Sequence, residues 1–81
     1  MKLWIGNIAP ETPDEEIRAL VKKYAPDLEC TKIQRVDGDG SRPAAMLEFA
    51  EFPLGALEKV SMRLNRMYWK NRELLVQTII R

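Results

Sequence analysis

The chain has 81 residues, of which 46% are hydrophobic and 31% are charged. This length gives room for one domain with one core, and the composition is that of a globular protein rather than a disordered tail. The net charge is +1, with 6 Lys and Arg against 8 Asp and Glu in residues 1–40, and 7 against 4 in residues 41–81. So small an imbalance gives no basis for binding duplex DNA through bulk charge.

Several classes of protein are disfavoured by what the sequence lacks. Histidine is absent and cysteine occurs once, at Cys30, so neither an intramolecular disulfide nor a metal-ligand cluster is expected. No apolar run reaches the length of a membrane span, and the N-terminus lacks the pattern of a secretory signal. We therefore expect a cytoplasmic protein with no metal, no cofactor and no membrane partner.

Residues 3–8, LWIGNI, predict the first strand and its orientation. Alternate side chains of a strand point to opposite faces, so Leu3 and Ile5 are expected to point toward a core and Trp4 away from it. A large ring on the outward face either packs under a loop or tail, or stacks against a base or a partner's side chain. Trp4 is therefore the first candidate for a binding residue.

A helix is predicted between Thr12 and Pro26. Thr12 is expected as the N-cap, Pro13 as the first helical residue, and Glu15 as the partner that completes a capping box. Pro26 cannot continue a helix and therefore ends it. The apolar residues are spaced to form one stripe toward the core, made of Ile17, Leu20, Val21 and Tyr24.

Two strands are predicted on either side of residues 37–40, DGDG, over residues 28–36 and 44–49. Two glycines and two aspartates favour a hairpin turn, whereas a calcium loop would need more carboxylates and a glutamate in register. The side chains expected inward are Thr31, Ile33, Ala45, Leu47 and Phe49, and those expected on the opposite face are Cys30, Lys32, Gln34, Ala44, Met46 and Glu48.

Pro53 is expected to open a second helix, and Asn71 to form a turn before a last strand over residues 74–80. The helix has an apolar stripe formed by Leu57, Val60, Leu64 and Met67. Its outer side is basic and is expected to be solvated, with Lys59, Arg63 and Arg66. In the last strand the inward residues are expected to be Leu74 and Val76, and the outward ones Leu75, Gln77 and Ile79. The aromatic residues expected at the edges of the core are Tyr24, Phe52 and Tyr68, with Trp69 in a structural role.

The predicted order is strand, helix, strand, strand, helix, strand, which is the ferredoxin-like βαββαβ arrangement of the α+β class. Right-handed crossovers place both helices on one face of a four-stranded antiparallel sheet, so the other face stays open. The residues expected on this open face are Trp4, Lys32, Gln34, Ala44, Met46, Glu48, Leu75, Gln77 and Ile79. The large apolar groups among them are Trp4, Met46, Leu75 and Ile79, and so many on an exposed face indicate a contact site.

Over essentially its whole length, the chain resembles the RNA recognition motif family. LWIGNI is similar to the family's six-residue motif, which reads aliphatic, aromatic, aliphatic, often glycine, asparagine, aliphatic. RPAAMLEF, residues 42–49, stands in the place of the eight-residue motif and matches it at Arg42, Ala45, Leu47 and Phe49. Residues 64–76 resemble the segment that leads into the family's fourth strand, with Arg66 and Asn71 where glycine is usual. The resemblance implies one such domain over residues 1–81.

The resemblance also implies that the open face binds single-stranded RNA, although two of the family's three aromatic positions are Ala44 and Met46 here. Trp4 is then the remaining stacking ring, and since Met46 can only lie against a base, weak binding is expected. Gln34 and Gln77 are candidates for contacts to base edges. The basic residues expected to contact phosphates or base edges are Lys2, Lys32, Arg35, Arg42 and Arg81.

Other functions are left open or disfavoured by the same residues. The apolar face could instead receive a protein partner or a second copy of the chain, and such a contact would depend little on salt, unlike RNA binding. An enzyme is not expected, because without histidine Ser41 and Ser61 have no activating base. Acylphosphatases of this fold need a glycine-rich loop after the first strand, and metal chaperones need two cysteines; the sequence supplies neither.

Overall fold

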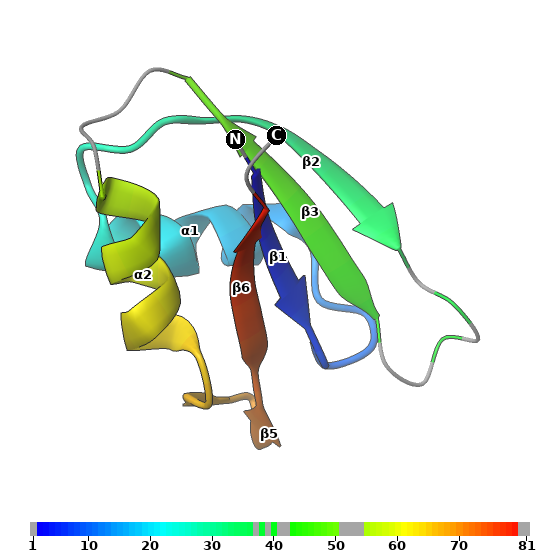
Figure 1. Ribbon diagram of the computed structural model, residues 1–81. Coiled ribbons are helices and arrows are strands. Elements are labelled where there is room, and N and C mark those ends of the chain that lie inside the picture. Colours follow the sequence, from blue (N-terminus) through cyan, green and yellow to red (C-terminus); the bar gives the residue numbers. More distant parts are fainter. Residues whose placement is uncertain (1, 37, 39, 41–42, 51–54, 80–81) are drawn as a thin grey trace.

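A computed structural model of the chain describes residues 2–36, 38, 40, 43–50 and 55–79. Within these ranges the elements follow the order β1 (Lys2–Gly6), α1 (Asp14–Tyr24), β2 (Cys30–Val36), β3 (Ala44–Phe49), α2 (Ala56–Leu64), β4 (Tyr68–Trp69), β5 (Arg72–Glu73) and β6 (Leu75–Ile79). Four strands form a sheet in the order β2-β3-β1-β6, in which every neighbouring pair is antiparallel (Figure 1). The predicted ferredoxin-like fold is thus confirmed. In the described part of the chain, neither helix is long and apolar enough to cross a membrane.

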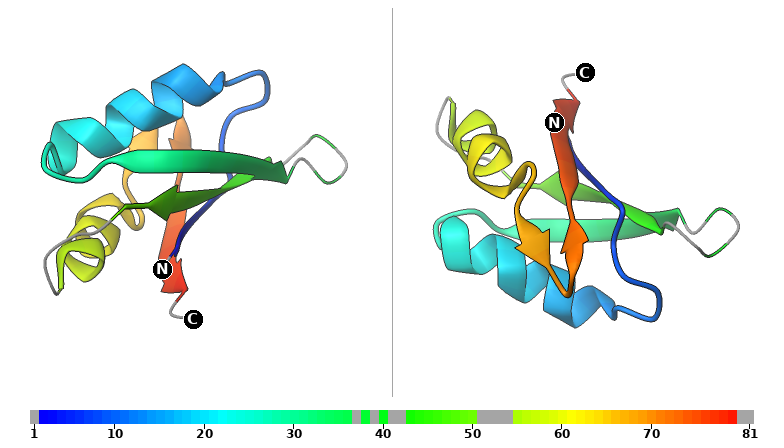
Figure 2. Two further views of the ribbon diagram at one scale, coloured as in Figure 1. Left: turned by 90° about the horizontal axis from the view of Figure 1, so that it is seen from above. Right: turned by 90° about the horizontal axis from the view of Figure 1, so that it is seen from below.

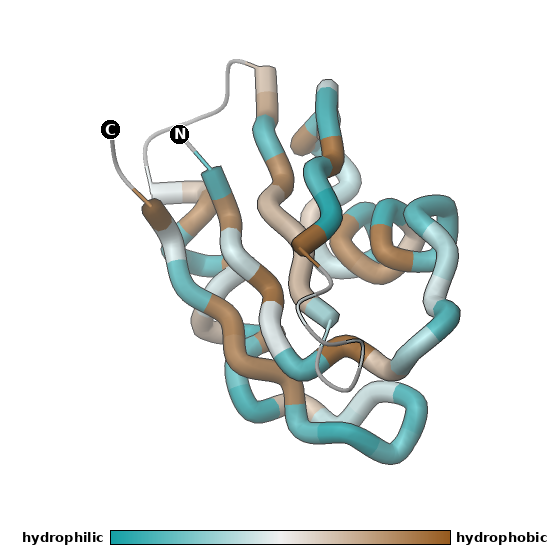
Figure 3. Tube along the Cα trace, turned by 90° about the vertical axis from the view of Figure 1, so that its right-hand side faces the viewer, coloured by the Kyte–Doolittle hydropathy of each residue, from teal (hydrophilic) through white to brown (hydrophobic). Residues whose placement is uncertain are grey.

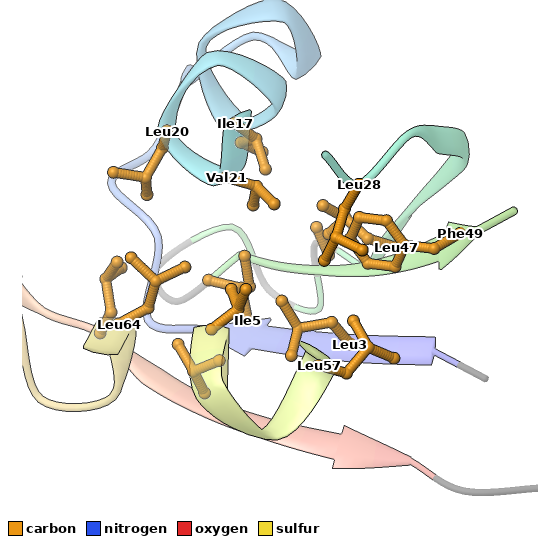
Figure 4. Packing of buried hydrophobic residues seen from close by; sticks show 14 of the residues in the cluster. Leu3, Ile5, Ile17, Leu20, Val21, Leu28, Leu47, Phe49, Leu57 and Leu64 are labelled. Carbon is orange, nitrogen blue, oxygen red and sulfur yellow. The ribbon is translucent and has the colours of Figure 1, made fainter. Parts of the chain in front are cut away.

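The core lies between the sheet and the two helices. Leu3, Ile5 and Leu47 point from the strands toward the helices and are fully buried, as Figure 4 shows. The helices meet them with the two predicted stripes, in which the buried residues are Ile17, Leu20, Val21, Leu57, Val60 and Leu64. Full burial of each such aliphatic side chain stabilises the fold by roughly 1.5–3 kcal/mol, so the helices are held on this face. The opposite face of the sheet is called the open face below.

The start of α1 differs from the predicted capping box. Pro13 is the N-cap, no side chain caps the helix, and Thr12 lies outside it with a buried hydroxyl that donates to the Ala9 carbonyl oxygen at 2.6 Å. Arg35 on β2 secures the helix start instead, since its Nη1 donates to the Thr12 carbonyl oxygen at 2.7 Å and to Asp14 Oδ1 at 3.0 Å. The Arg35 side chain is therefore held on the helix side of the sheet, and its expected phosphate or base-edge contact stays a prediction.

A bulge in β2 changes which face two of its residues occupy. The pairing shifts between Cys30, which is opposite Phe49, and Lys32, which is opposite Glu48. Cys30 consequently packs against the core, while Thr31 is exposed and its hydroxyl donates to the Glu48 carbonyl oxygen at 3.3 Å. The predictions for Cys30 and Thr31 are wrong because one extra residue in a strand reverses the alternation that precedes it.

The segment around α2 departs further from the predicted elements. The helix begins at Ala56 after Gly55, whose φ is 83°, while Pro53 and Phe52 lie outside the described residues. After α2, β4 and β5 form a small hairpin that the sequence did not predict, and Figure 2 shows it beside α1. Its two turn residues, Lys70 and Asn71, have positive φ values of 55° and 66°, as the tightest hairpins require.

The aromatic residues of the hairpin differ from one another in burial. Trp69 is half-buried against the core, as is Tyr24 of α1, so both predictions are confirmed. Tyr68 is 75% exposed, and its assignment to the core edge is wrong. In a strand only two residues long, one of two neighbouring side chains must point outward.

Asn7 ties the loop after β1 to β5. Its Nδ2 group donates to the Glu73 carbonyl oxygen at 2.9 Å, and Arg72 Nη1 donates to Asn7 Oδ1 at 3.3 Å and to the Ile8 carbonyl oxygen at 3.2 Å. Asn7 has a φ of 60°, a conformation that asparagine tolerates better than most residues. The asparagine of LWIGNI therefore has a structural role at the end of the strand that carries Trp4.

Candidate nucleic-acid interface

The strand pairing aligns side chains of the open face in rows that cross the sheet. Gln34 is opposite Met46, Met46 is opposite Trp4, and Trp4 is opposite Gln77, so one row spans all four strands. Neighbouring strands lie about 4.8 Å apart. The row therefore has a glutamine amide at each end, with the Met46 thioether and the Trp4 ring between them. The two glutamines are exposed, and Trp4 and Met46 are half-buried. We call these four residues the central row.

A charged row lies beside the central row. Lys32 is opposite Glu48, Glu48 is opposite Lys2, and Lys2 is opposite Ile79. Lys32 Nζ is 4.0 Å from Glu48 Oε2, and the two lysines are exposed. The row therefore has one carboxylate between two cations, with a net charge of +1 from these side chains. Such a row can attract a phosphate while the carboxylate limits the attraction.

On the other side of the central row the face is apolar. Val36 is opposite Ala44, and Gly6 is opposite Leu75. Val36 and Leu75 are 41% and 55% exposed, whereas Ala44 is only 4% exposed. Ala44 lies on the open face as predicted but offers almost no surface, and its contact with RNA stays a prediction. Figure 3 shows the alternation of apolar and polar residues along the strands that produces these two faces.

The indole of Trp4 lies over Gly6. A Cβ atom on Gly6 would stand 3.1 Å from Trp4 Nε1 and 3.9 Å from Leu75 Cβ. Beside the ring, toward the edge strand β6, is a hollow of about 450 Å³ lined by Trp4, Asn65, Leu75, Val76 and Gln77. The ring is thus one wall of a shallow, partly polar site, large enough for a planar group to lie against it.

Comparison with known proteins identifies the fold. No protein family model matches the chain, and no curated protein matches it. Among solved structures, the third RRM of Pes4 is 19% identical with a TM-score of 0.79, over 99% of this chain and 92% of that chain. The chain has the RNA recognition motif (RRM) fold.

Two further structures share this RRM fold. The N-terminal three RNA binding domains of the yeast splicing factor Prp24 match at 17% identity and a TM-score of 0.78, over 99% of this chain and 33% of that chain. The RRM of Rna15, solved with bound RNA (GU), matches at 19% identity and a TM-score of 0.71, over 94% of this chain and 79% of that chain. At these identities the likeness extends to the fold, and the site depends on the residues of this chain.

The structure brings most of the predicted site residues together on the open face of the RRM fold. The central row and the charged row hold six of them, namely Gln34, Met46, Trp4, Gln77, Lys32 and Lys2. Arg42 and Arg81 lie outside the described residues. The sequence did not predict Asn65, which follows α2, bonds to β6 through its side chain and lines the same hollow as Trp4. A loop residue of this kind has no periodic signal that could reveal it.

Cys30 lines a separate hollow of about 560 Å³ on the helix side, between α1 and the segment that follows it. Burial raises the pKa of the Cys30 thiol above its ordinary value of 9.0, and Sγ donates to the Lys32 carbonyl oxygen at 3.4 Å. A thiol held neutral is a poor nucleophile. In the described ranges no group of three or more side chains is arranged to hold a metal ion.

Proposed function

We propose that this domain binds single-stranded RNA weakly on its open face, with Trp4 as the stacking ring. The observation that supports it most is the central row, in which the half-buried Trp4 ring stands in register with two amides and a thioether. A base stacked on Trp4 would have Gln77 on the neighbouring strand within reach of its edge. Met46, opposite Trp4 on the other side, can lie against the next base or a ribose.

The charged row supports the same proposal, since it supplies cations at a suitable distance from the ring. Successive residues on one face of a strand are two positions apart, so Lys2 lies roughly 7 Å from Trp4 along β1. This is close to the spacing of successive phosphates in an extended RNA strand. The phosphate contacts would come from Lys2 and Lys32, with Glu48 between them reducing their strength.

The weak affinity follows from the number of rings. Ala44 is buried and Met46 has no π face, so in the described part of the open face Trp4 is the one aromatic platform. Each base stacked on an aromatic side chain contributes roughly 1–3 kcal/mol, and a face with one ring lacks the contribution of two. The Rna15 domain, solved with RNA (GU), supports RNA as a ligand of the fold.

Binding of a fluorescently labelled eight-nucleotide RNA, followed by anisotropy, tests the proposal. Trp4→Ala should lower the affinity by about fivefold to a hundredfold, which corresponds to one lost stack. Tyr68→Ala is the matched control, because Tyr68 is an exposed ring on the β4–β5 hairpin rather than on the open face. Equal losses in the two variants, or no loss in Trp4→Ala, would refute stacking on Trp4.

A second candidate function is protein binding by the apolar side of the open face. Val36 and Leu75 are 41% and 55% exposed, half-buried Met46 lies next to them in the central row, and half-buried Ile79 adds a separate apolar group beside the charged row. Such a surface on a sheet is typical of a protein contact or a dimer. Sedimentation equilibrium at low and high salt separates the candidates. A dimer that persists at high salt and whose formation abolishes RNA binding would favour this second function.

A further inference from the structure

We infer that Asn65 selects the base that stacks on Trp4, favouring uracil over adenine. The inference rests on the proposed RNA-binding function and adds a specificity-determining residue to the same site. Asn65 is the C-cap of α2, it is exposed, and it lines the hollow that opens beside Trp4. A base that covers the ring and extends across β6 would meet this side chain at the edge of the sheet.

The orientation of the Asn65 amide is fixed by its partner. The backbone N–H of Val76 donates to Asn65 Oδ1 at 3.0 Å. Because a backbone N–H can only donate, the atom that receives it must be the oxygen, whichever way the amide was assigned. The remaining polar atom of the side chain is Nδ2, which can only donate. Asn65 therefore offers a hydrogen-bond donor to the hollow.

The position of Asn65 is also well anchored. Its backbone N–H donates to the Ser61 carbonyl oxygen at 2.8 Å, which closes the last turn of α2. Ser61 Oγ in turn donates to the Val76 carbonyl oxygen at 3.3 Å. The backbone N–H of Val76 is thus bonded to the side chain of Asn65, and its carbonyl oxygen to the side chain of Ser61. A donor held in this way loses little conformational entropy when a base binds to it.

The other polar side chain of the hollow does not discriminate in the same way. Gln77 is exposed, and a glutamine amide can rotate to offer either its oxygen or its nitrogen. It can therefore pair with the edge of any base that stacks on Trp4. Asn65 cannot adapt, because turning its nitrogen toward Val76 would leave two donors facing each other. The fixed donor is the group that distinguishes one base from another.

The chemistry of the bases gives the direction of the preference. Uracil carries two exocyclic carbonyl oxygens, so it presents an acceptor to Asn65 Nδ2 in more than one orientation. Adenine has no carbonyl oxygen. Its acceptors are ring nitrogens, and beside N1 and N7 its exocyclic amine would oppose the Asn65 donor. Stacking alone predicts the reverse order, because a purine covers more of an indole ring. A preference for uracil would therefore come from hydrogen bonding.

The test compares binding of the RNA octamers U8 and A8 to the wild-type chain and to Asn65→Asp. Aspartate keeps an oxygen for the Val76 N–H but replaces the outward donor with an acceptor. The wild-type chain should bind U8 about threefold to tenfold more tightly than A8, and Asn65→Asp should lower this ratio of affinities by a similar factor. The added negative charge of the variant acts on the binding of both octamers, and the self-stacking of A8 is the same for both proteins. The comparison of the two ratios therefore removes both effects.

Ser61→Ala is the control, because it removes a bond to the same edge of β6 without altering the hollow. Its ratio should equal that of the wild-type chain. A ratio unchanged in Asn65→Asp, or lowered equally in Ser61→Ala, would overturn the role of Asn65 while leaving RNA binding intact. Failure of the wild-type chain to bind either octamer would instead refute the proposed function, and the inference with it.

Discussion

Trp4 and Gly6 lie on the same face of β1, and the indole of Trp4 occupies the space that a side chain on residue 6 would need. The Nε1 atom is 3.1 Å from the point where a Cβ atom on Gly6 would stand. Gly6 does not have a positive φ, so its backbone conformation does not require glycine. The glycine of LWIGNI is thus explained by the ring that lies over it, and the same ring lines the hollow at β6.

Gly6→Ala should lower RNA affinity by about threefold to tenfold and change the free energy of unfolding by less than about 1 kcal/mol. The new methyl group meets the far end of a side chain that can rotate away, so the ring moves while the strand does not. Anisotropy and urea denaturation measure the two effects. In a Trp4→Ala background, Gly6→Ala should have no effect on affinity, and an equal loss there would show that the ring is not involved.

Glu48→Gln should raise RNA affinity by about twofold to fivefold, because Glu48 lies between Lys2 and Lys32 and competes with phosphates for both. The slope of log affinity against log salt should steepen as well. Glu58→Gln on α2 removes the same charge from an exposed position away from the open face, and it should have a smaller effect. Equal effects of the two substitutions would mean that only net charge matters.

Arg66→Gly should stabilise the fold by roughly 0.5–1 kcal/mol. Arg66 has a φ of 66°, a conformation that costs a non-glycine residue about 1–2 kcal/mol, of which the greater chain entropy of glycine in the unfolded state offsets a part. Urea denaturation measures the change. Arg66→Ala is the control, because it removes the same charge but keeps a Cβ, and an equal gain from alanine would rule out backbone strain as the cause.

Cys30 should react slowly with iodoacetamide in the folded chain at pH 8.5, at least about threefold more slowly than in urea. Burial raises the pKa of its thiol above 9.0, so the folded state holds the thiol neutral where the unfolded state begins to ionise. The contribution of this group to stability is complete below pH 9.0 and is lost as the pH rises through the higher pKa of the folded state. Equal rates in both states would contradict the packing given to Cys30.

The fold was predictable because its alternating and helical patterns are long. Leu3, Ile5 and Leu47 follow a period of two, and only one face of each strand can be buried. The faces of Cys30 and Thr31 were not predictable, because a bulge depends on the partner strand.

Local competition explains the other differences from the sequence-based predictions. Threonine is a residue type typical of an N-cap, but the Thr12 hydroxyl donates to the Ala9 carbonyl oxygen and the helix starts later. The β4–β5 hairpin has strands of two residues, too short to show a period.

The candidate site was predictable as a set of outward residues but not as an arrangement. Which residues share a row depends on the register between strands, and the sequence of one strand does not contain it. The burial of Ala44 and the position of Asn65 likewise depend on neighbours that are distant in sequence.

The most direct test of RNA binding on the open face is an NMR titration of the ¹⁵N-labelled chain with U8 at low and high salt. The two indole N–H resonances give an internal control, since Trp4 lies on the open face and Trp69 packs against the core at the β4–β5 hairpin. RNA should shift the Trp4 indole and the amides of β1 and β3, leave the Trp69 indole in place, and lose these effects at high salt. An unmoved Trp4 indole at low salt, with saturating RNA, would contradict RNA binding through this ring.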